Sequence, residues 1–460
     1  MFKRYIGDRA FYARAMRIAI PMIIQNGITN FVSLLDNIMV GQVGTIPMSG
    51  VSVVNGLLFV FNLCIFGACS GAGIFTAQFH GSGDNEGIRH TFRFKILLAL
   101  LLSALGIGIF LSFSTPLIRL YLQGEGDATD AAGVLEYGLD YLHVMLWGLL
   151  PFALSSAYSG TLRETGQTTI PMTAGITAVF VNLILNYVLI FGHFGAPAMG
   201  VRGAALATVI SRFVELAIVA GWLHLHREQN PYIQGVYRSF RIPGVLLKSI
   251  IIKGMPLLVN EFFWASGMAI LNQCYSTCGL DVVPATNIAS TLYNLGGVVY
   301  MAMGTAVGIL MGQMLGAGLS EPEVRTANRQ LIFASVFCGS IFGFLMGAFS
   351  GLFPQLYNTT DDVRHLATIL ICINACIMPF SSYLNATYFT LRSGGQTIVT
   401  FLFDSCFIWC CCVPLVFCLS RFTAITIIPL FAIAQATDIV KCALGAYMLK
   451  QGKWIQNLTV

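Results

Sequence analysis

Long apolar segments separated by short polar connections dominate this sequence of 460 residues. A helix needs roughly 20 apolar residues to cross the hydrocarbon core of a bilayer. Twelve segments of that kind are found: 15–40, 51–78, 96–118, 137–161, 169–192, 201–225, 250–277, 285–314, 331–352, 365–389, 397–419 and 424–449. They are too long for the strands of an outer-membrane barrel, and they lack the required alternation. The pattern therefore predicts an all-α integral membrane protein with twelve transmembrane helices.

The basic residues gather on one side of these spans. Nineteen of the 25 Lys and Arg residues lie in the amino-terminal segment, in the connections after even-numbered spans, or in the tail. Four lie on the other side: Arg119, Arg202, Arg364 and Arg421. Because Lys and Arg are enriched in cytoplasmic loops, we expect a multi-pass protein of the cell (inner or plasma) membrane with both termini in the cytoplasm.

The second half of the chain repeats the first. Gln78–Gly83 resembles Gln313–Gly318 at a shift of 235, and Thr161–Thr168 resembles Thr390–Thr397 at a shift of 229. Each half holds six spans, so both halves enter the membrane from the same side and should be related by a pseudo-two-fold axis along the membrane normal. The expected parts are an N-terminal six-helix lobe, a cytoplasmic linker and a C-terminal six-helix lobe: 1–225, 226–249 and 250–460. Two such lobes are typical of a secondary transporter.

Composition excludes several classes of protein. Charged residues make up 10% of the chain, against about 25% in a soluble domain, so neither a soluble enzyme nor a nucleic-acid binder is expected. The sequence has no phosphate-binding loop and none of the common hydrolase motifs. Most of its thirteen cysteines lie in apolar runs, where they serve as small packing residues. We expect no catalytic residue, no metal site and no organic cofactor.

Ionisable residues inside the spans are costly in lipid, so each is a candidate for function. Five of them have structural explanations. Arg212 can pair with Glu215 three residues further along the same helix. Lys441 can pair with Asp438 on its own helix or with Asp404, which lies at a similar depth in the neighbouring span.

Asp36 differs because no basic residue lies three or four positions away. Asn182 and Asn186 share one face of the fifth span, and Thr208 of the sixth span lies at roughly the same depth. Together they form an oxygen-rich set that suits a hard monovalent cation, or a carboxyl group that takes up a proton. The alternative is a set of polar contacts that only join helices. Glu261, near the middle of the seventh span, also lacks a helical basic partner.

Three motifs resemble the signature of the multidrug and toxic compound extrusion (MATE) family. They are Leu35–Gly44, Leu162–Gly166 with the following Pro171, and Gly203–Thr208. The resemblance implies export of organic cations and other amphipathic compounds in exchange for H⁺ or Na⁺. It also implies a cation site in the first lobe, formed by Asp36, Asn182, Asn186 and Thr208. Glu261 matches an acidic position in one branch of the family, as a second cation site or as a contact for cationic substrate.

We therefore expect an antiporter that exports organic cations, drugs or other amphipathic compounds by alternating access, driven by H⁺ or Na⁺. Its partners are the lipid bilayer and a small organic substrate, with no nucleic acid, and it is expected to be a monomer. The alternative is a flippase or exporter of the same architecture for a lipid precursor or metabolite. A membrane enzyme would need an acidic or metal cluster at the membrane surface, and a sensor would need a long soluble segment; the sequence shows neither.

Overall fold

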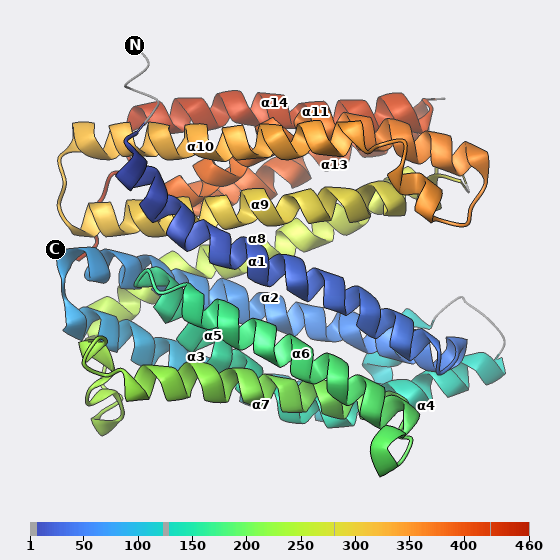
Figure 1. Cartoon of the computed structure of the whole chain (residues 1–460). Helices are drawn as coiled ribbons and strands as arrows, with labels where there is room; N and C mark the ends of the chain where they lie inside the picture. The colour runs from blue at the N-terminus through green and yellow to red at the C-terminus, as the bar shows by residue number, and fades with distance from the viewer. Residues whose placement is uncertain (1–6, 123–127, 280, 424, 460) are drawn as a thin grey trace. The chain divides into compact units, whose positions relative to one another are not determined.

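The computed structural model describes residues 7–122, 128–279, 281–423 and 425–459. Helices account for nearly all of these residues, and none of the described residues forms a β-strand (Figure 1). A helix satisfies every backbone N–H and C=O within its own segment, which lipid cannot do. The predicted all-α class is confirmed. Two of the basic residues counted at the amino terminus, Lys3 and Arg4, lie outside the described residues.

The twelve predicted spans correspond in order to the observed helices. The first six are α1 Arg9–Gly41, α2 Thr45–Ser82, α3 Asn85–Tyr121, the pair α4 Ala128–Met145 and α5 Leu149–Glu164 with the 3₁₀ turn η2 Leu146–Gly148 between them, α6 Thr169–Phe191 and α7 Val201–Leu225. The last six are α8 Gly244–Ser276, α9 Val282–Gly316, α10 Glu321–Ala348, α11 Asp361–Ser393, the broken helix α12 Thr397–Phe401 to α13 Val413–Phe422, and α14 Ile427–Gln451.

Shorter helical segments connect or interrupt these helices. The connections contain 3₁₀ turns: η3 His193–Gly195, η4 Pro231–Ile233, η5 Val236–Arg238 and η6 Phe353–Leu356. Between α12 and α13 the backbone is π-helical over η7 Leu402–Cys406 and η8 Ile408–Cys412. Such π-helical turns are rare and are frequently found at functional sites.

Several helices are longer than the predicted spans. The helix α2 has 38 residues and is therefore roughly 57 Å long, well beyond the roughly 30 Å of a hydrocarbon core. Hydropathy marks only the part of a helix that lies in lipid, so polar helix ends escape it. Eleven helical segments of the described chain are long and apolar enough to cross a membrane. The helix α8 is not among them, although it has 33 residues; Asn260 and Glu261 interrupt its apolar run.

The chain divides into two compact units. One contains the amino-terminal residues through Ile23 together with Ala77–Asp84 and Ile250–Val460, and the other contains Ile24–Thr76 and Asn85–Ser249. These units differ from the expected lobes at the start of α1 and at the end of α2. The reason is packing: Ala15 and Ile18 of α1 are buried in a core otherwise built mainly from α9, α10 and α11. The lobe boundaries taken from the internal repeat stay a prediction.

In the first of these units, α9, α10, α11 and α14 lie side by side (Figure 1). The end of α2 approaches α9 at two glycines of the repeated motif. A Cβ atom on Gly81 would lie 1.9 Å from the Gln313 carbonyl oxygen, and one on Gly316 would lie 1.9 Å from that of Gln78. The same motif thus supplies both sides of the contact, and only glycine permits this approach.

In the other unit, buried charges join the helices. Lys95 of α3 is fully buried and forms an ion pair with Glu164 at the end of α5. The Lys95 ammonium also donates a hydrogen bond of 3.2 Å to Thr161 Oγ1. Next to Glu164, Arg163 donates a hydrogen bond of 3.0 Å to Gln25 Oε1 of α1. Two neighbouring charged residues of the motif Leu162–Gly166 therefore connect α5 to other helices. Glu164 binds α3, and Arg163 binds α1.

The contact between α2 and α9 generates the first prediction. Gly316→Ala should lower the free energy of unfolding by about 1–3 kcal/mol or more, because the new methyl group overlaps a backbone carbonyl that cannot move freely. The melting temperature of the purified protein in detergent measures this loss. Gly221→Ala on α7, where nothing lies within 4 Å of the added Cβ, is the matched control and should change the melting temperature little. Equal melting temperatures for the two variants would contradict this close contact.

Candidate functional site

Asp36 lies five residues before the end of α1 and is half-buried. None of the ion pairs in the described part of the chain involves Asp36. The position of Asp36 therefore favours uptake of a positive charge.

The hairpin of α6 and α7 brings the polar partners to Asp36. Gly192 ends α6 in the left-handed conformation, with φ of 76°, and allows the chain to turn. Gly203 then lets α7 approach α6 closely, because a Cβ at this position would lie 2.5 Å from the Leu189 carbonyl oxygen. Thr208 follows Gly203 within the same motif and reaches Asn182 on α6. The small residues of Gly203–Thr208 thus place its hydroxyl group.

Hydrogen bonds join the four predicted residues into one cluster. Asn186 Nδ2 donates to Asp36 Oδ1 at 2.8 Å. With its amide nitrogen turned toward Asp36, Asn182 donates to Asp36 Oδ2 at 2.8 Å, and its oxygen accepts from Thr208 Oγ1 at 3.2 Å. Both asparagines are buried, at 7% and 2% exposure. The predicted grouping of Asp36, Asn182, Asn186 and Thr208 is what the structure brings together.

One buried oxygen of this cluster has no partner. Asn186 Oδ1 accepts no hydrogen bond from any described residue, although it is shielded from solvent. Together with the Asp36 carboxylate it provides oxygen atoms of the kind that bind hard cations. No group of three or more His, Cys, Asp or Glu side chains that could hold a metal ion occurs in the described chain. The cluster thus combines one carboxylate with neutral amide and hydroxyl groups.

Two further residues at this site were not predicted. Tyr141 of α4 is buried, interacts with Thr208 and lies close enough to Asp36 to feel its charge. Its hydroxyl group donates a hydrogen bond of 3.2 Å to Asn55 Oδ1 on α2. The sequence holds sixteen tyrosines and no pattern that separates this one from the rest. Asn55 is a polar residue inside an apolar run, and this was the one feature of the sequence that could have pointed to the contact with Tyr141.

The sequence suggested that Arg212 pairs with Glu215 on the same helix, but in the structure Arg212 contacts other groups. Arg212 Nη1 donates to the Gly148 carbonyl oxygen at 3.2 Å, and its guanidinium group lies over the Phe152 ring at 4.9 Å. The larger charge interaction of Glu215 is with Arg163 on α5. The i,i+3 spacing allowed an intrahelical pair, but the turn η2 offers Arg212 a free carbonyl group on a neighbouring helix.

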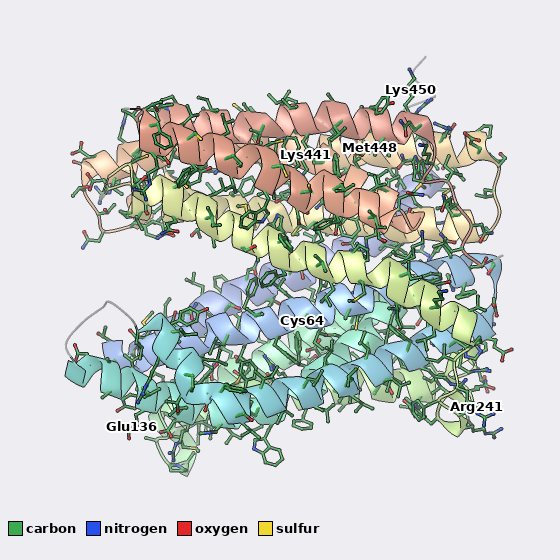
Figure 2. The ribbon with its side chains drawn as sticks, turned by 180° about the vertical axis from the view of Figure 1, so that it is seen from behind. Cys64, Glu136, Arg241, Lys441, Met448 and Lys450 are labelled. Carbon is green, nitrogen blue, oxygen red and sulfur yellow. The ribbon has the colours of Figure 1, made fainter. Side chains whose placement is uncertain are left out.

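The second half of the chain has a polar network of its own. Lys441 of α14 forms an ion pair of 2.7 Å with Asp404, and its ammonium group lies 5.2 Å from the centre of the Phe403 ring. Asn260 of α8 donates to Asp404 Oδ2 at 3.2 Å and to the Tyr388 hydroxyl oxygen at 3.3 Å. Of the two partners left open by the sequence, Asp404 is the one that contacts Lys441. Figure 2 shows Lys441 midway along α14.

Glu261 is the one predicted candidate outside the Asp36 cluster. It follows Asn260 on α8 and is half-buried, and it interacts electrostatically with Arg392 and Asp404. It therefore lies beside the Asp404–Lys441 pair, in the compact unit that does not contain Asp36. Its role as a second cation site or a substrate contact stays a prediction.

Comparison with known proteins agrees with this architecture. Residues 21–188 and 256–417 both match the family model MatE. The two segments begin 235 residues apart and end 229 residues apart, the same shifts that the internal repeat shows.

Relatives match over nearly the full length. A probable multidrug resistance protein NorM of Thermotoga maritima is 24% identical over 99% of this chain and 96% of its own length. A protein of the same name from Pasteurella multocida is 25% identical over 98% of this chain and 92% of its own length.

Solved structures show the same fold. A MATE crystal structure in the straight conformation covers 98% of this chain and 97% of its own, with a TM-score of 0.86 at 20% identity. An outward-facing multidrug resistance MATE family transporter of the MOP superfamily covers 97% of each chain, with a TM-score of 0.85 at 21% identity.

The buried ion pair generates the second prediction. Lys441→Met should lower the free energy of unfolding by about 3–5 kcal/mol, because Asp404 loses its positive partner in a buried setting. The double variant Lys441→Met with Asp404→Asn should recover most of this loss, since no unpaired carboxylate remains. Melting temperatures of the purified variants give both values.

Arg202→Met provides the control for this experiment. It breaks a surface pair of 2.7 Å with Asp140, in which the Arg202 side chain is 60% exposed. Such pairs contribute at most about 1 kcal/mol, so the melting temperature should change little. A double variant at Lys441 and Asp404 no more stable than Lys441→Met would contradict a specific interaction between the two residues.

Proposed function

Because the chain belongs to the MatE family of membrane transporters, we propose that it is a cation-coupled antiporter that exports drugs or other amphipathic organic cations. The family makes it a multi-pass membrane transporter and not an enzyme. The substrate class is supported by the relatives, which are named multidrug resistance proteins. Coupling to a cation is supported mainly by Asp36, whose half-buried carboxylate is hydrogen-bonded only to neutral groups.

The amide groups around Asp36 suit two charge states. An Asn side chain can present either its nitrogen as donor or its oxygen as acceptor. While Asp36 is negative, the amide nitrogens of Asn182 and Asn186 face it, as the distances of 2.8 Å show. When a proton or Na⁺ arrives, rotated amides would turn their oxygens toward the new positive charge. Thr208 and Tyr141 complete the hydrogen bonds in either state.

The helix α1 connects this site to the other compact unit. Its residues through Ile23 pack with α9, α10 and α11, whereas Asp36 lies in the segment that belongs to the second unit. Pro21 lies two residues before that division. Proline removes a backbone donor and kinks a helix interior. A change in the packing of Asp36 would therefore alter the course of α1 near Pro21, and this supports alternating access.

Coupling follows if the two states of the transporter differ in cation affinity. An ion entering from outside would neutralise Asp36 and favour the state that releases substrate, since a ligand shifts an equilibrium only by its differential affinity. The distribution of Lys and Arg supports cytoplasmic termini, so that substrate would be taken up from the cytoplasm or the inner leaflet. One chain contains both halves, which supports function as a monomer.

The proposed function is tested by efflux from liposomes. Wild type should export a cationic dye when a proton or a sodium gradient is imposed, and Asp36→Asn should lose at least about 90% of the gradient-driven rate. The amide keeps the shape of the carboxyl group but cannot take up a proton or neutralise a cation. The gradient that drives the wild type identifies the coupling ion.

Asp140→Asn is the matched control, because Asp140 lies in the same half of the chain at a surface ion pair. It should retain efflux near the wild-type rate. Gradient-driven export that persists in Asp36→Asn would exclude Asp36 as the coupling group. Absence of dye export from a correctly inserted wild type would instead exclude the proposed substrate class.

A further inference from the structure

A pocket of about 450 Å³ lies between α10, α11, α14 and the segment that follows α14. Its lining has two chemically distinct parts. Arg325, Arg329 and Lys450 are basic, and most of the remaining lining residues are aliphatic or aromatic. None of the described residues that line the pocket is Asp or Glu. Neither the Asp36 cluster nor the Asp404–Lys441 pair contributes to it.

The basic and apolar residues follow one another along each helix. On α10, Arg325 and Arg329 are one turn apart, and Phe333 and Val336 continue the same face. From Arg325 to Val336 the helix rises about 16 Å, close to the roughly 15 Å of hydrocarbon in one leaflet. On α14, Lys450 lies at the end of the helix (Figure 2) and Ala446 lines the pocket one turn earlier. The pocket is thus basic at one end and apolar over the depth of an acyl chain.

The three basic residues differ in how they are engaged. Arg325 pairs with Glu321 at 2.7 Å and donates to the Lys450 carbonyl oxygen at 3.1 Å, so it holds α10 against the end of α14. The side chains of Arg329 and Lys450 are exposed and form no hydrogen bond or ion pair with any described residue. Two positive charges at the mouth of the pocket are therefore available to a ligand.

The wall formed by the tail is firmly placed. Trp454 is 1% exposed, and its Nε1 donates a hydrogen bond of 3.2 Å to the Leu449 carbonyl oxygen. Tyr383 of α11 and Leu449 complete this apolar side. A free phosphate or another small soluble anion would leave the apolar walls without a contact. They suit a molecule that is anionic at one end and hydrocarbon at the other.

We propose that this pocket binds one anionic phospholipid, with its phosphate between Arg329 and Lys450 and an acyl chain along Phe333 and Val336. Guanidinium and ammonium groups are the usual partners of phosphate. Basic pockets between membrane helices on the cytoplasmic side recognise acidic headgroups, and Arg329 and Lys450 lie on the side where most of the basic residues gather. The site is separate from the Asp36 cluster, so it stands whether or not the proposed coupling does.

Lipid binding to the purified full chain tests this proposal. The chain is delipidated in an uncharged detergent and titrated with phosphatidylglycerol, phosphatidylcholine or inorganic phosphate, and native mass spectrometry counts the retained molecules. One phosphatidylglycerol should bind saturably, phosphatidylcholine at least about tenfold more weakly, and phosphate should not compete. Equal binding of the two lipids, or displacement by inorganic phosphate, would overturn the proposal.

Variants separate the two parts of the pocket. Arg329→Gln with Lys450→Gln should weaken phosphatidylglycerol binding at least about tenfold, whereas Arg238→Gln with Lys248→Gln removes the same charge from the linker region and should leave binding unchanged. Ala446→Trp keeps the basic residues and fills the apolar part, so it should also abolish tight binding. Unchanged binding in the pocket variants, or an equal loss in the linker control, would show only diffuse attraction to the basic surface and would overturn the proposal.

Discussion

Lipid offers no hydrogen bonds, and this constraint determines both the helices and the few polar contacts that join them. Within the spans, charges are tolerated where a partner neutralises them. Lys95 has Glu164 and Lys441 has Asp404. Asp36 has only neutral amide groups. Lys95 and Lys441 are thus paired charges that join helices, whereas Asp36 forms no ion pair with any described residue.

The two halves share a backbone plan but place their polar groups differently. At the shifts of 235 and 229 residues shown by the family match, Asp36 corresponds to Leu271, and Asn186 corresponds to Leu415. The second half thus has leucines at the positions of Asp36 and Asn186, whereas Thr437 keeps the hydroxyl group of Thr208. Conversely, Asp404 corresponds to Gly175, which packs against the Gln25 side chain. A duplicated fold supplies two equivalent frameworks, and a few substitutions decide which position in each becomes polar.

Sequence patterns predicted what depends on local periodicity. Apolar run length located all twelve spans, and depth along the helices was enough to group Asn182 and Thr208 with Asp36. Contacts between helices were harder to predict. Spacing alone paired Arg212 with Glu215, because it carries no information about the free carbonyl group that η2 presents. Tyr141 was missed for a related reason, since its role depends on which face of α4 meets α7.

The division of α1 between the two compact units explains how a small change at Asp36 could affect a distant part of the chain. About 20 Å of helix separate Asp36 from the point near Ile23 where α1 enters the other unit. A helix is stiff over that length, so a shift at one end is carried to the other unless the helix bends. Pro21 provides a place to bend, because its ring displaces the carbonyl group one turn earlier. Beyond Pro21, Ala15 and Ile18 are held in a close-packed core that tolerates few intermediate positions. A helix held in this way offers one route by which the charge on Asp36 would bias the alternating access proposed above.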